Sequence, residues 1–460
     1  MKLILLSGGS GKRLWPLSND IRSKQFLKML HGPNGVPESM VQRIWRQLDS
    51  NKLVDHVYIS TSKQQTDLIE KQLGTDVSLI IEPEQRDTFP AIALAATYLH
   101  SIQGVHPNEV VVVMPVDPYV EDPFFMKIKQ LENLIFQSGA DLGLIGVTPT
   151  YASTKYGYIV PHKDEDELES GRPYKRVKSF KEKPTEEQAG RLLEQEALWN
   201  CGVFAFRLGY LIEKLKKNGY PVDYNKLVAL YENLSKISFD YEVVEKAEHV
   251  IVVPYQGYWK DLGTWNTITD EMNANVIGRS IINENCSNTH IINELNIPVA
   301  AIGLSDMVVA ASPDGILVIE KTKSHLVKNI TTIVDQRPMF EERRWGWYRV
   351  VDFQKLDENT EMLTKKLHID AQKNLSYQYH HHRREVWVIV SGEGEFVLDD
   401  SLRLIGPGDV LEIPVGAKHG IKALTDMDII EVQLGSKLEE NDIVRLFMSW
   451  EELKTYLNHT

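Results

Sequence analysis

Short apolar runs alternate with longer stretches in which apolar residues recur every three or four positions, from residue 2 to about residue 255. The runs predict buried strands over residues 2–6, 56–61, 78–82, 110–117 and 141–147. The longer stretches predict helices over residues 40–48, 63–73, 88–102 and 122–137. This alternation is typical of a mostly parallel sheet with helices on both faces, in which a ligand binds beyond the carboxyl ends of the strands.

A glycine-rich turn follows the first predicted strand, and positively charged residues follow the turn. The glycines are Gly8, Gly9 and Gly11, and the cations are Lys12, Arg13 and Lys24. Glycines let backbone N–H groups approach an anion with no Cβ in the way, and the cations attract it. We therefore predict that this turn binds a polyphosphate.

Two common phosphate-binding motifs do not fit the turn. A Walker A loop has Ser or Thr directly after its lysine, where this chain has Arg13. The dinucleotide-binding fingerprint has a third glycine where this chain has Leu14. A glycine-rich turn can also be a plain connection between a strand and a helix, but the residues that follow favour a functional loop.

Composition and charge limit the class of protein. The chain has 460 residues, which is too many for one ordinary core, so we expect two or three domains. A net charge of −13 argues against nucleic acid as the main partner, although a pocket can be locally basic. The only cysteines are Cys201 and Cys286, which indicates neither a disulfide framework nor a Cys-based zinc site. We find no signal peptide and no apolar stretch of about 18 residues, and expect a cytoplasmic protein without membrane partners.

The string around the turn resembles the signature of sugar-1-phosphate nucleotidyltransferases. Residues 14–18 (Leu-Trp-Pro-Leu-Ser) and 24–27 (Lys-Gln-Phe-Leu) are similar to the mannose-1-phosphate guanylyltransferase branch, except that Ser23 stands where that family has proline. The resemblance implies that a guanylyl group passes from GTP to mannose 1-phosphate, giving GDP-mannose and pyrophosphate. It assigns Arg13 and Lys24 to the triphosphate, where they stabilise charge as pyrophosphate leaves.

Two aspartates far apart in the sequence are the metal ligands that the resemblance implies. Asp117 ends an apolar strand, where an aspartate is more often a turn residue, and Pro118 follows it where the family has histidine. Asp261 lies in residues 259–265, which resemble the family's second metal-binding stretch. Mg²⁺ prefers one or two carboxylates together with phosphate oxygens and water, so we expect Asp117 and Asp261 to share it.

The resemblance also implies which residues bind the guanine base and which bind the sugar phosphate. Taken alone, residues 82–91 indicate the start of a helix, with an N-cap residue and a proline in the first turn. The resemblance implies that this segment, with Glu82 and Arg86, lies beside guanine. The residues implied to bind the sugar phosphate are Gly157, Glu182, Lys183 and Asn200. The carboxylate suits sugar hydroxyls, the lysine suits the phosphate, and the amide can both donate and accept. The Phe-Asp-Tyr-Glu stretch at 239–242 resembles the one that precedes the second metal segment.

The pattern changes twice after residue 275. Residues 280–334 contain short β-like pieces and turns, which predict a β-rich linker or partial β-helix, and from about 336 to 432 strands and glycine turns alternate as in an all-β barrel. We therefore predict an α/β fold: a Rossmann-like nucleotidyltransferase domain over 1–275, the linker over 276–335, and a C-terminal cupin β-barrel over 336–460.

The cupin prediction depends on residues 378–385 (Gln-Tyr-His-His-His-Arg-Arg-Glu) and 408–419, which resemble the two halves of the cupin pattern. The resemblance implies four metal ligands: Gln378, His380, Glu385 and His419. In a strand, residues two apart share a face, so His382 would share one with the first two of these. Such ligands suit Zn²⁺ or another divalent metal, and the alternative is that the three histidines form a solvated polar strand.

The order of the domains resembles bifunctional enzymes that join a phosphomannose isomerase to a guanylyltransferase, in which the residue matching Arg383 serves the isomerase. The likeness is weaker here, because Val386 replaces a histidine and residues 442–450 lack the family's Tyr-Gly-Arg ending. An isomerase moves a proton between neighbouring carbons beside a polarised carbonyl, and the alternative is a metal-binding cupin kept for assembly or sugar sensing.

Two other functions remain open at this point. The same fold serves other bases and other sugar 1-phosphates, and a degenerate member would be a non-catalytic nucleotide-sugar-binding or regulatory protein. For the guanylyltransferase function, we expect GTP and mannose 1-phosphate as partners and a homo-oligomer, specifically a dimer. A degenerate site would tolerate the loss of Asp117 and Asp261.

Overall fold

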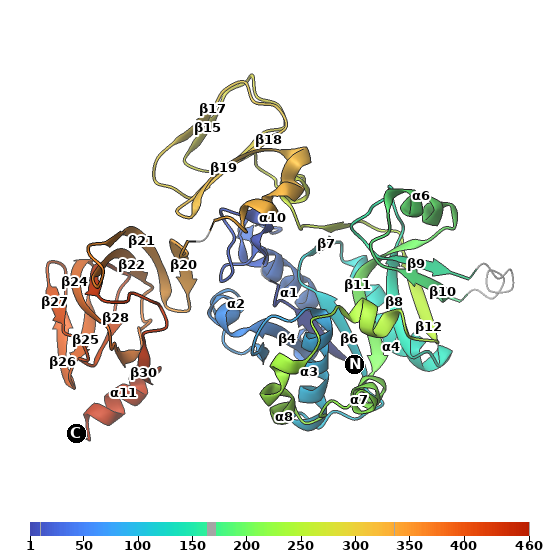
Figure 1. Cartoon of the computed structure of the whole chain (residues 1–460), viewed down its shortest axis with the longest axis horizontal. Coiled ribbons are helices and arrows are strands. Elements are labelled where there is room, and N and C mark those ends of the chain that lie inside the picture. Colours follow the sequence, from blue (N-terminus) through green and yellow to red (C-terminus); the bar gives the residue numbers. More distant parts are fainter. Residues whose placement is uncertain (10, 163–171, 335, 460) are drawn as a thin grey trace.

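The structure is a computed structural model that describes residues 1–9, 11–162, 172–334 and 336–459. Ser10 of the glycine-rich turn and residue 335, at the predicted end of the linker, therefore lie outside the described residues. Figure 1 shows three units: an α/β unit that contains the N-terminus, a β-rich unit above it, and a β-barrel at the C-terminus. Among the helices described, none combines the length and the apolar content that crossing a membrane requires.

The α/β unit is built on one nine-stranded sheet in the order β5-β4-β1-β6-β11-β8-β12-β10-β9. Its strands are β1 (Lys2–Leu6), β4 (Val57–Ser62), β5 (Ser78–Glu82), β6 (Val110–Pro115), β8 (Leu142–Val147), β9 (Tyr158–Pro161), β10 (Lys175–Lys181), β11 (Leu198–Arg207) and β12 (Val250–Tyr255). Strands β5, β4, β1 and β6 are parallel, as are β8 and β12. Strands β10 and β11 run antiparallel to their neighbours, a feature that the apolar pattern does not reveal.

Helices cover both faces of this sheet because its buried strands alternate their side chains between two cores. Leu3 and Leu5 belong to the core on one face and Ile4 belongs to the other. The first face carries α1 (Met40–Ser50), α2 (Thr66–Leu73), α4 (Pro123–Ser138) and α6 (Glu186–Glu194). The second carries α3 (Thr88–Ser101), α7 (Leu208–Lys217) and α8 (Tyr224–Ala229). The predicted α/β domain is confirmed.

Short elements surround the glycine-rich turn. They are β2 (Leu30–His31), β3 (Pro37–Glu38), β7 (Pro118–Val120), β13 (Trp259–Asp261) and α9 (Trp265–Thr269). Strand β13 pairs antiparallel with β7, which places Asp261 opposite Pro118. This pairing brings the second metal-binding stretch next to Asp117.

The middle unit stacks short strands in parallel, as a partial β-helix does. Strands β14, β16 and β18 are parallel neighbours, β19 returns antiparallel, and β15 pairs with β17. The elements are β14 (Val276–Gly278), β15 (Ser280–Ile282), β16 (His290–Asn293), β17 (Val299–Ala301), β18 (Met307–Ser312), β19 (Gly315–Glu320) and α10 (Val327–Ile330). The predicted linker is thus confirmed as a small β-helical unit.

The C-terminal unit is a barrel of two antiparallel sheets, in the orders β20-β21-β22-β29-β24-β27 and β26-β25-β28-β23-β30. The strands are β20 (Phe340–Arg343), β21 (Gly346–Lys355), β22 (Glu361–Ile369), β23 (Tyr377–Tyr379), β24 (Arg383–Ser391), β25 (Gly394–Leu398), β26 (Ser401–Ile405), β27 (Val410–Ile413), β28 (His419–Ala423), β29 (Met427–Gly435) and β30 (Val444–Phe447), followed by α11 (Trp450–Leu457). The predicted cupin barrel is confirmed.

Candidate active site

A cavity of about 530 Å³ opens beyond the carboxyl ends of β1, β5 and β6. It is lined by Leu6, Ser7, Gly8, Gly9, Gly11, Lys24, Gln25, Glu82, Gln85, Arg86, Asp87, Thr88, Ala91, Pro115, Val116, Asp117 and Lys236. Its position is the one expected for a ligand of a parallel sheet, because the ends of parallel strands meet at one edge. A volume of this size suits a nucleotide.

The glycines of the turn are needed where the chain passes close to other atoms. A Cβ on Gly8 would lie 2.6 Å from Oε1 of Glu82. Gly11 has a left-handed φ of +54°, and a Cβ there would lie 2.5 Å from the backbone N of Lys24. Gly9 faces open space, so its backbone is bare on the cavity side. The three glycines therefore line the cavity, and the space beside Gly9 leaves its backbone uncovered.

Side chains that follow the turn hold it in place. The Ser23 hydroxyl donates to the Gly9 carbonyl at 2.9 Å, and the Gln65 amide donates to the same carbonyl at 3.2 Å. The Gln25 amide donates to the Ser7 carbonyl at 2.7 Å. Ser23, which departs from the family's proline, thus supplies a hydrogen bond that proline cannot make.

Lys24 brings the two predicted metal ligands together. Its Nζ lies 2.7 Å from Oδ2 of Asp117 and 3.7 Å from Oδ1 of Asp261. The three side chains come from three separate segments, and they meet because β7 and β13 pair beside the turn. The two carboxylates thus hold one cation in this structure, the ammonium of Lys24.

The electrostatics of this cluster follow from burial and the shared ammonium. Burial by itself raises the pKa of Asp117, but the Lys24 charge outweighs it, so the net pKa lies below its usual value. For Asp261, burial and the Asp117 charge together keep the pKa above its usual value in spite of Lys24. The pKa of Lys24 is raised, because the two carboxylates outweigh burial. Asp117 and Lys24 are therefore shifted toward their charged forms, whereas Asp261 is shifted toward its neutral form.

The other two cations lie differently. Arg13 is exposed, and it is close enough to Lys24, Asp117 and Asp261 to affect their pKa values. Lys12 forms an ion pair with Asp20 at 2.7 Å and lines a separate cavity of about 100 Å³. The structure thus brings Arg13 close to the carboxylate pair, and the Lys12 side chain does not line the cavity of about 530 Å³.

Glu82 and Arg86 also line the cavity, with Glu82 against the glycine turn at Gly8. Glu82 is buried, and it accepts hydrogen bonds from the hydroxyls of Ser60 and Tyr231 at 3.2 Å and 3.0 Å. Burial raises the pKa of Glu82 to about 7, although both hydroxyls lower it. Arg86 donates to the Leu234 carbonyl at 2.6 Å, which ties the cavity wall to a later segment. The N-cap of α3 is Asp87, whose side chain accepts from the Thr88 N–H at 2.7 Å.

The four residues assigned to the sugar phosphate form one cluster. The Asn200 backbone N–H donates to the Gly157 carbonyl at 2.8 Å, and a Cβ on Gly157 would overlap the Glu182 carboxylate. Lys183 Nζ lies 2.8 Å from Glu182 Oε1. The cluster therefore combines hydrogen-bonding groups with one cation, as recognition of a phosphorylated sugar requires.

A fifth member of this cluster is Asp240, which lies in the 239–242 stretch and was not among the predicted sugar-binding residues. The Asn200 side chain donates to its Oδ1 at 2.7 Å. Burial and the nearby Glu182 charge raise the pKa of Asp240 to about 6. The resemblance of residues 239–242 to a family stretch was the sequence feature that could have indicated Asp240. The sequence position of this stretch did not predict its contact with Asn200.

Tyr156 connects the sugar cluster to the carboxylate pair. Its ring centroid lies 5.0 Å from that of Trp199 and 5.2 Å from that of Trp259. Trp199 precedes Asn200, and Trp259 lies on β13 with Asp261. Burial raises the pKa of Tyr156, and the charge of Asp261 adds to this effect. Aromatic packing thus sets the spacing between the two clusters.

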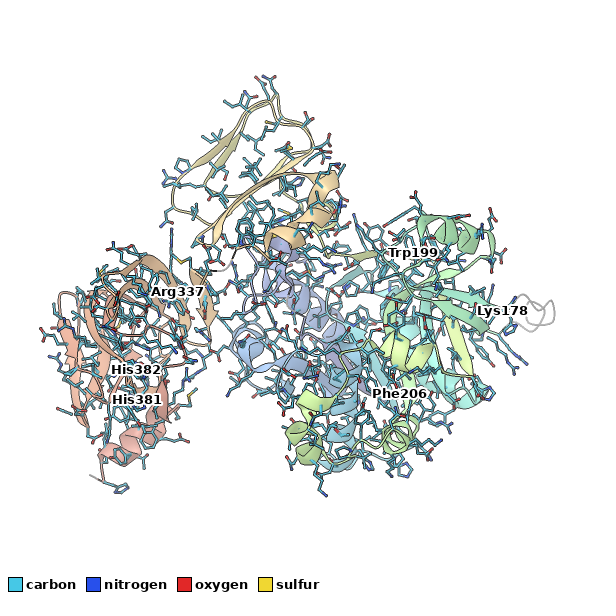
Figure 2. All side chains as sticks on the ribbon, in the orientation of Figure 1. Lys178, Trp199, Phe206, Arg337, His381 and His382 are labelled. Atoms are coloured by element: carbon cyan, nitrogen blue, oxygen red, sulfur yellow. The ribbon has the colours of Figure 1, made fainter. Side chains whose placement is uncertain are left out.

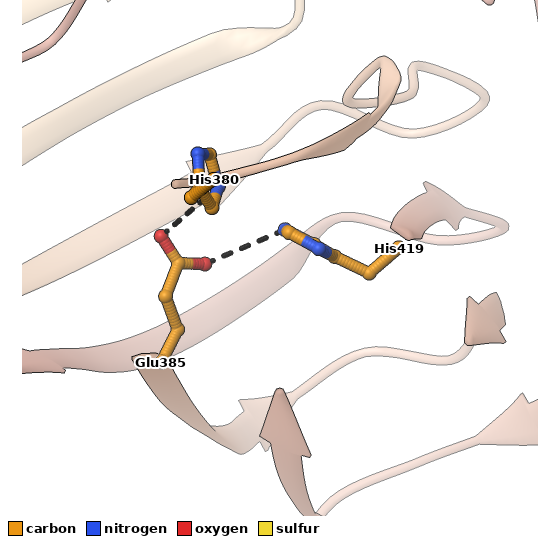
Figure 3. Close-up of side chains that lie close together, drawn as sticks. All are labelled: His380, Glu385 and His419. Atoms are coloured by element: carbon orange, nitrogen blue, oxygen red, sulfur yellow. Dashed lines mark ion pairs between the residues drawn. The ribbon is translucent and has the colours of Figure 1, made fainter. Parts of the chain in front are cut away.

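The cupin barrel holds a second cluster of candidate ligands, shown in Figure 3. Nε2 of His380 lies 3.3 Å from Oε1 of Glu385, and Nε2 of His419 lies 3.5 Å from Oε2. The ligand atoms of the three residues lie within 4.8 Å of one another. All three side chains are buried, so the histidine run is not simply a solvated strand at this position. His381 and His382, labelled in Figure 2, are exposed.

The backbone fixes which nitrogen of each histidine faces the cluster. Nδ1 of His380 lies 2.6 Å from the Asp442 carbonyl, and Nδ1 of His419 lies 3.0 Å from the Ala417 carbonyl. A carbonyl accepts only, so each Nδ1 carries the proton and each Nε2 lone pair points inward. Nε2 of His419 is buried and makes no hydrogen bond within the described part of the chain. This donor set fits a divalent metal such as zinc.

Arg383 and Gln378 border this cluster. Arg383 Nε donates to Glu385 Oε1 at 2.8 Å, and its Nη2 lies 3.3 Å from His380 Nε2. The Gln378 amide nitrogen lies 3.5 Å from His380 Nε2. Burial opposes ionisation of Glu385, but the His419, His380 and Arg383 groups outweigh it and lower its pKa. Three predicted ligands therefore converge, with the predicted isomerase arginine against them.

Protein-family models match the chain in three segments. The model described as nucleotidyl transferase matches residues 2–276, that of the mannose-6-phosphate isomerase C-terminal domain matches residues 334–447, and that of the MannoseP isomerase/GMP-like beta-helix domain matches residues 286–334. The three segments follow the three units of the structure.

Relatives match over almost their full length. Alginate biosynthesis protein AlgA of Pseudomonas aeruginosa is 31% identical, with 96% of this chain and 95% of the relative covered. Mannose-1-phosphate guanylyltransferase of Escherichia coli (strain K12) is 29% identical, with 96% and 97% covered. A solved structure, described as mannose-1-phosphate geranyltransferase from Thermus thermophilus, is 26% identical with a TM-score of 0.59, and covers 72% of this chain and 98% of its own.

Proposed function

We propose that this chain, which belongs to the nucleotidyl transferase family, transfers a guanylyl group from GTP to mannose 1-phosphate and releases pyrophosphate. The observation that carries the proposal is the meeting of Lys24, Asp117 and Asp261 at a cavity of nucleotide size. The full-length relatives, which include a protein named mannose-1-phosphate guanylyltransferase, support the choice of substrates. The product, GDP-mannose, would supply polysaccharide synthesis.

The reaction needs one bond to form and one to break. A phosphate oxygen of mannose 1-phosphate attacks the α-phosphorus of GTP, and the bond from that phosphorus to the bridging oxygen of the β-phosphate breaks. The electron pair leaves with pyrophosphate, whose charge Lys24 and Arg13 offset. The bare backbone at Gly8, Gly9 and Gly11 holds the phosphates, so catalysis consists of positioning and charge neutralisation.

Members of this family work with a divalent metal, and the residues here fit Mg²⁺. Asp117 and Asp261 would hold it, because two carboxylates beside a phosphate site are the ligands that this ion prefers. Bound there, Mg²⁺ would neutralise phosphate charge and orient the α-phosphate. The Lys24 ammonium shares these carboxylates, and we expect it to turn toward the phosphates as the substrates bind.

The other residues of the site are assigned to the guanine base and to the sugar phosphate. Glu82 and Arg86 line the cavity, and we assign them to the side of the guanine base. Gly157, Glu182, Lys183 and Asn200 would bind mannose 1-phosphate, and Asp240 orients the Asn200 amide. The predicted surroundings are the cytoplasm, and the predicted assembly is a homodimer.

A screen for pyrophosphate release tests the proposal. Four nucleoside triphosphates are combined with several sugar 1-phosphates, each with and without Mg²⁺. The proposal expects the highest rate with GTP and mannose 1-phosphate, and release only with Mg²⁺. A higher rate with another pair would assign a different base or sugar, and no release with any pair would favour a non-catalytic binding protein.

We further propose mannose-6-phosphate isomerase activity in the cupin unit. The buried set of His380, Glu385 and His419, with Arg383 against it, is the specific observation in favour. Bound there, Zn²⁺ or another divalent metal would polarise the sugar carbonyl. Incubation with fructose 6-phosphate, followed by an assay for mannose 6-phosphate, tests the activity. Failure to convert the sugar in a metal-loaded protein would leave the barrel a role in assembly or sugar sensing.

A further inference from the structure

The turn formed by residues 19–22 lies between the nucleotide loop and the two C-terminal units. Asn19 Oδ1 accepts from the backbone N–H groups of Ile21 and Arg22, at 3.0 Å and 2.8 Å, so the turn is internally fixed. Its outer side chains reach the β-helical unit and the first strand of the cupin. The turn therefore touches all three units of the chain.

Arg22 makes the strongest of these connections. Its Nη1 and Nη2 bond the two oxygens of Glu294 at 2.8 Å and 2.9 Å, directly after β16. Its Nε lies 3.2 Å from Oε1 of Glu342, on β20 of the cupin. The ring of Phe340 lies 5.1 Å from the guanidinium carbon. One buried side chain thus links the α/β unit to both other units.

A second connection runs beside the first. Asn19 donates to Oδ2 of Asp314 at 2.9 Å, and the backbone N–H of Met339 donates to the other oxygen of Asp314 at 2.5 Å. Asp314 follows β18 of the β-helical unit, and Met339 directly precedes β20. The turn is therefore held at two points, each of which involves both C-terminal units.

The residues directly after this turn hold the active site. Ser23 bonds the Gly9 carbonyl, Lys24 contacts Asp117 and Asp261, and Gln25 bonds the Ser7 carbonyl. Only Ser23 lies between Arg22 and Lys24, and its hydroxyl is bonded to the Gly9 carbonyl, so Arg22, Lys24 and the glycine turn are physically connected. A shift of Arg22 would therefore displace the Lys24 backbone and the glycine turn together.

We propose that Arg22 is a positioning residue for guanylyl transfer, which acts through Lys24. By binding Glu294 and Glu342, it sets the Lys24 ammonium and the glycine turn at the carboxylate pair, so the rate of transfer depends on correct docking of the β-helical and cupin units. Arginine suits this role because its planar fork bonds the Glu294 carboxylate with two nitrogens, while its charge also forms an ion pair with Glu342. The proposal rests on the proposed guanylyltransferase function.

The test compares Arg22→Gln and Arg22→Lys with the full-length wild type. Pyrophosphate release with GTP, mannose 1-phosphate and Mg²⁺ gives kcat and KM, and thermal unfolding gives the midpoint. We expect Arg22→Gln to lower kcat about 10- to 100-fold, because small displacements of reacting groups cost this much. We expect KM for mannose 1-phosphate to stay within about threefold, because the sugar cluster lies on other segments. Arg22→Lys should recover part of the rate, since the charge remains but the two-pronged geometry is lost.

Arg343→Gln is the matched control. Arg343 lies on β20 at the same interface, and among the described residues its ion pairs are with Asp67 of α2, at 3.9 Å, and with Glu341, rather than with the 19–22 turn. We expect this variant to lower the unfolding midpoint and leave kcat unchanged. An equal loss of kcat in Arg343→Gln would overturn the proposal, because loosening of the interface would then explain the effect.

Glu294→Gln provides the independent test if Arg22→Gln does not fold. It removes the partner charge and keeps the side-chain shape, and we expect the same fall in kcat as for Arg22→Gln. Combining the two substitutions should add little to either, because they break one interaction. Unchanged kcat in Arg22→Gln or Glu294→Gln would overturn the positioning role alone. Absence of pyrophosphate release from the wild type would instead overturn the proposed function.

Discussion

The nucleotide cavity and the cupin cluster both hold acidic groups beside a basic side chain, but they hold them differently. Asp117 and Asp261 are about one-third exposed and share the flexible ammonium of Lys24. Glu385 is 1% exposed, is held by the rigid guanidinium of Arg383 and lies beside two imidazoles. The first site is open to an incoming charged substrate, whereas the second is closed around its own charges.

The difference shows that the type of basic partner affects how firmly a carboxylate is held and whether it is ionised. Lysine carries a compact charge on a flexible stem, so it can leave a carboxylate when another cation arrives. Arginine offers a fixed fork, and its permanent charge beside Glu385 favours the ionised carboxylate in a buried place. Glu82 provides the contrast, because it is buried without a basic partner among its hydrogen bonds and its pKa rises to about 7.

The largest expected effect tests whether the open site depends on its carboxylates. Asp117→Asn should lower kcat for guanylyl transfer about a thousandfold or more, because it removes a charge that we assign to metal binding. Pyrophosphate release at saturating Mg²⁺ measures the loss. Asp49→Asn, at the exposed end of α1, is the control and should match the wild type. A variant at position 117 with normal turnover would contradict the assignment of this site.

The next effect separates charge stabilisation from substrate binding at the same site. Arg13→Ala should lower kcat about 100- to 1000-fold, as loss of a group that stabilises transition-state charge does, with KM for mannose 1-phosphate nearly unchanged. Steady-state kinetics with both substrates varied provide the measurement. Arg191→Ala, which removes an exposed cation on α6, serves as the comparison. Equal turnover in Arg13→Ala would remove this residue from the mechanism.

The closed site is tested by removing one ligand. His419→Ala should weaken zinc binding at least about 10- to 100-fold, since even partners of metal ligands have effects of that size, and guanylyl transfer should be unchanged. Elemental analysis after dialysis against zinc gives the metal content. His382→Ala changes an exposed histidine of the same run and should keep the metal. Full metal content in His419→Ala would exclude this cluster as the zinc site.

The smallest effect concerns Glu82, the acid without a basic partner. The folded protein keeps a proton on Glu82 up to about pH 7, whereas the unfolded chain releases it near the ordinary value of 4.5. The free energy of unfolding therefore falls as the pH rises through this window, and Glu82→Gln should remove that part of the dependence. We expect the variant to gain roughly 1 to 3 kcal/mol relative to the wild type between pH 5 and pH 8. Parallel curves for the two proteins in urea titrations at these pH values would argue against a raised pKa.

Local sequence alone predicted several parts of the molecule well. The strand before the glycine turn, the helix that begins at Thr88 and the short strands between 280 and 320 all lie where their apolar spacing placed them. Such elements are set by neighbouring residues, because side chains alternate along strands and repeat around helices. The strand directions were harder to predict, since an apolar run such as β11 reads the same in either direction.

The sequence by itself determined which residue types were available: bare backbone at the turn, cations behind it, two aspartates and a histidine run. Only the tertiary structure decided which of them meet. It joined Asp261 to Asp117 through the β7–β13 pairing, turned Lys12 toward Asp20, added Asp240 to the sugar cluster and tied Arg22 to Glu294. The reason is physical, since residue type and spacing fix local geometry, whereas contacts between distant segments depend on how whole elements pack.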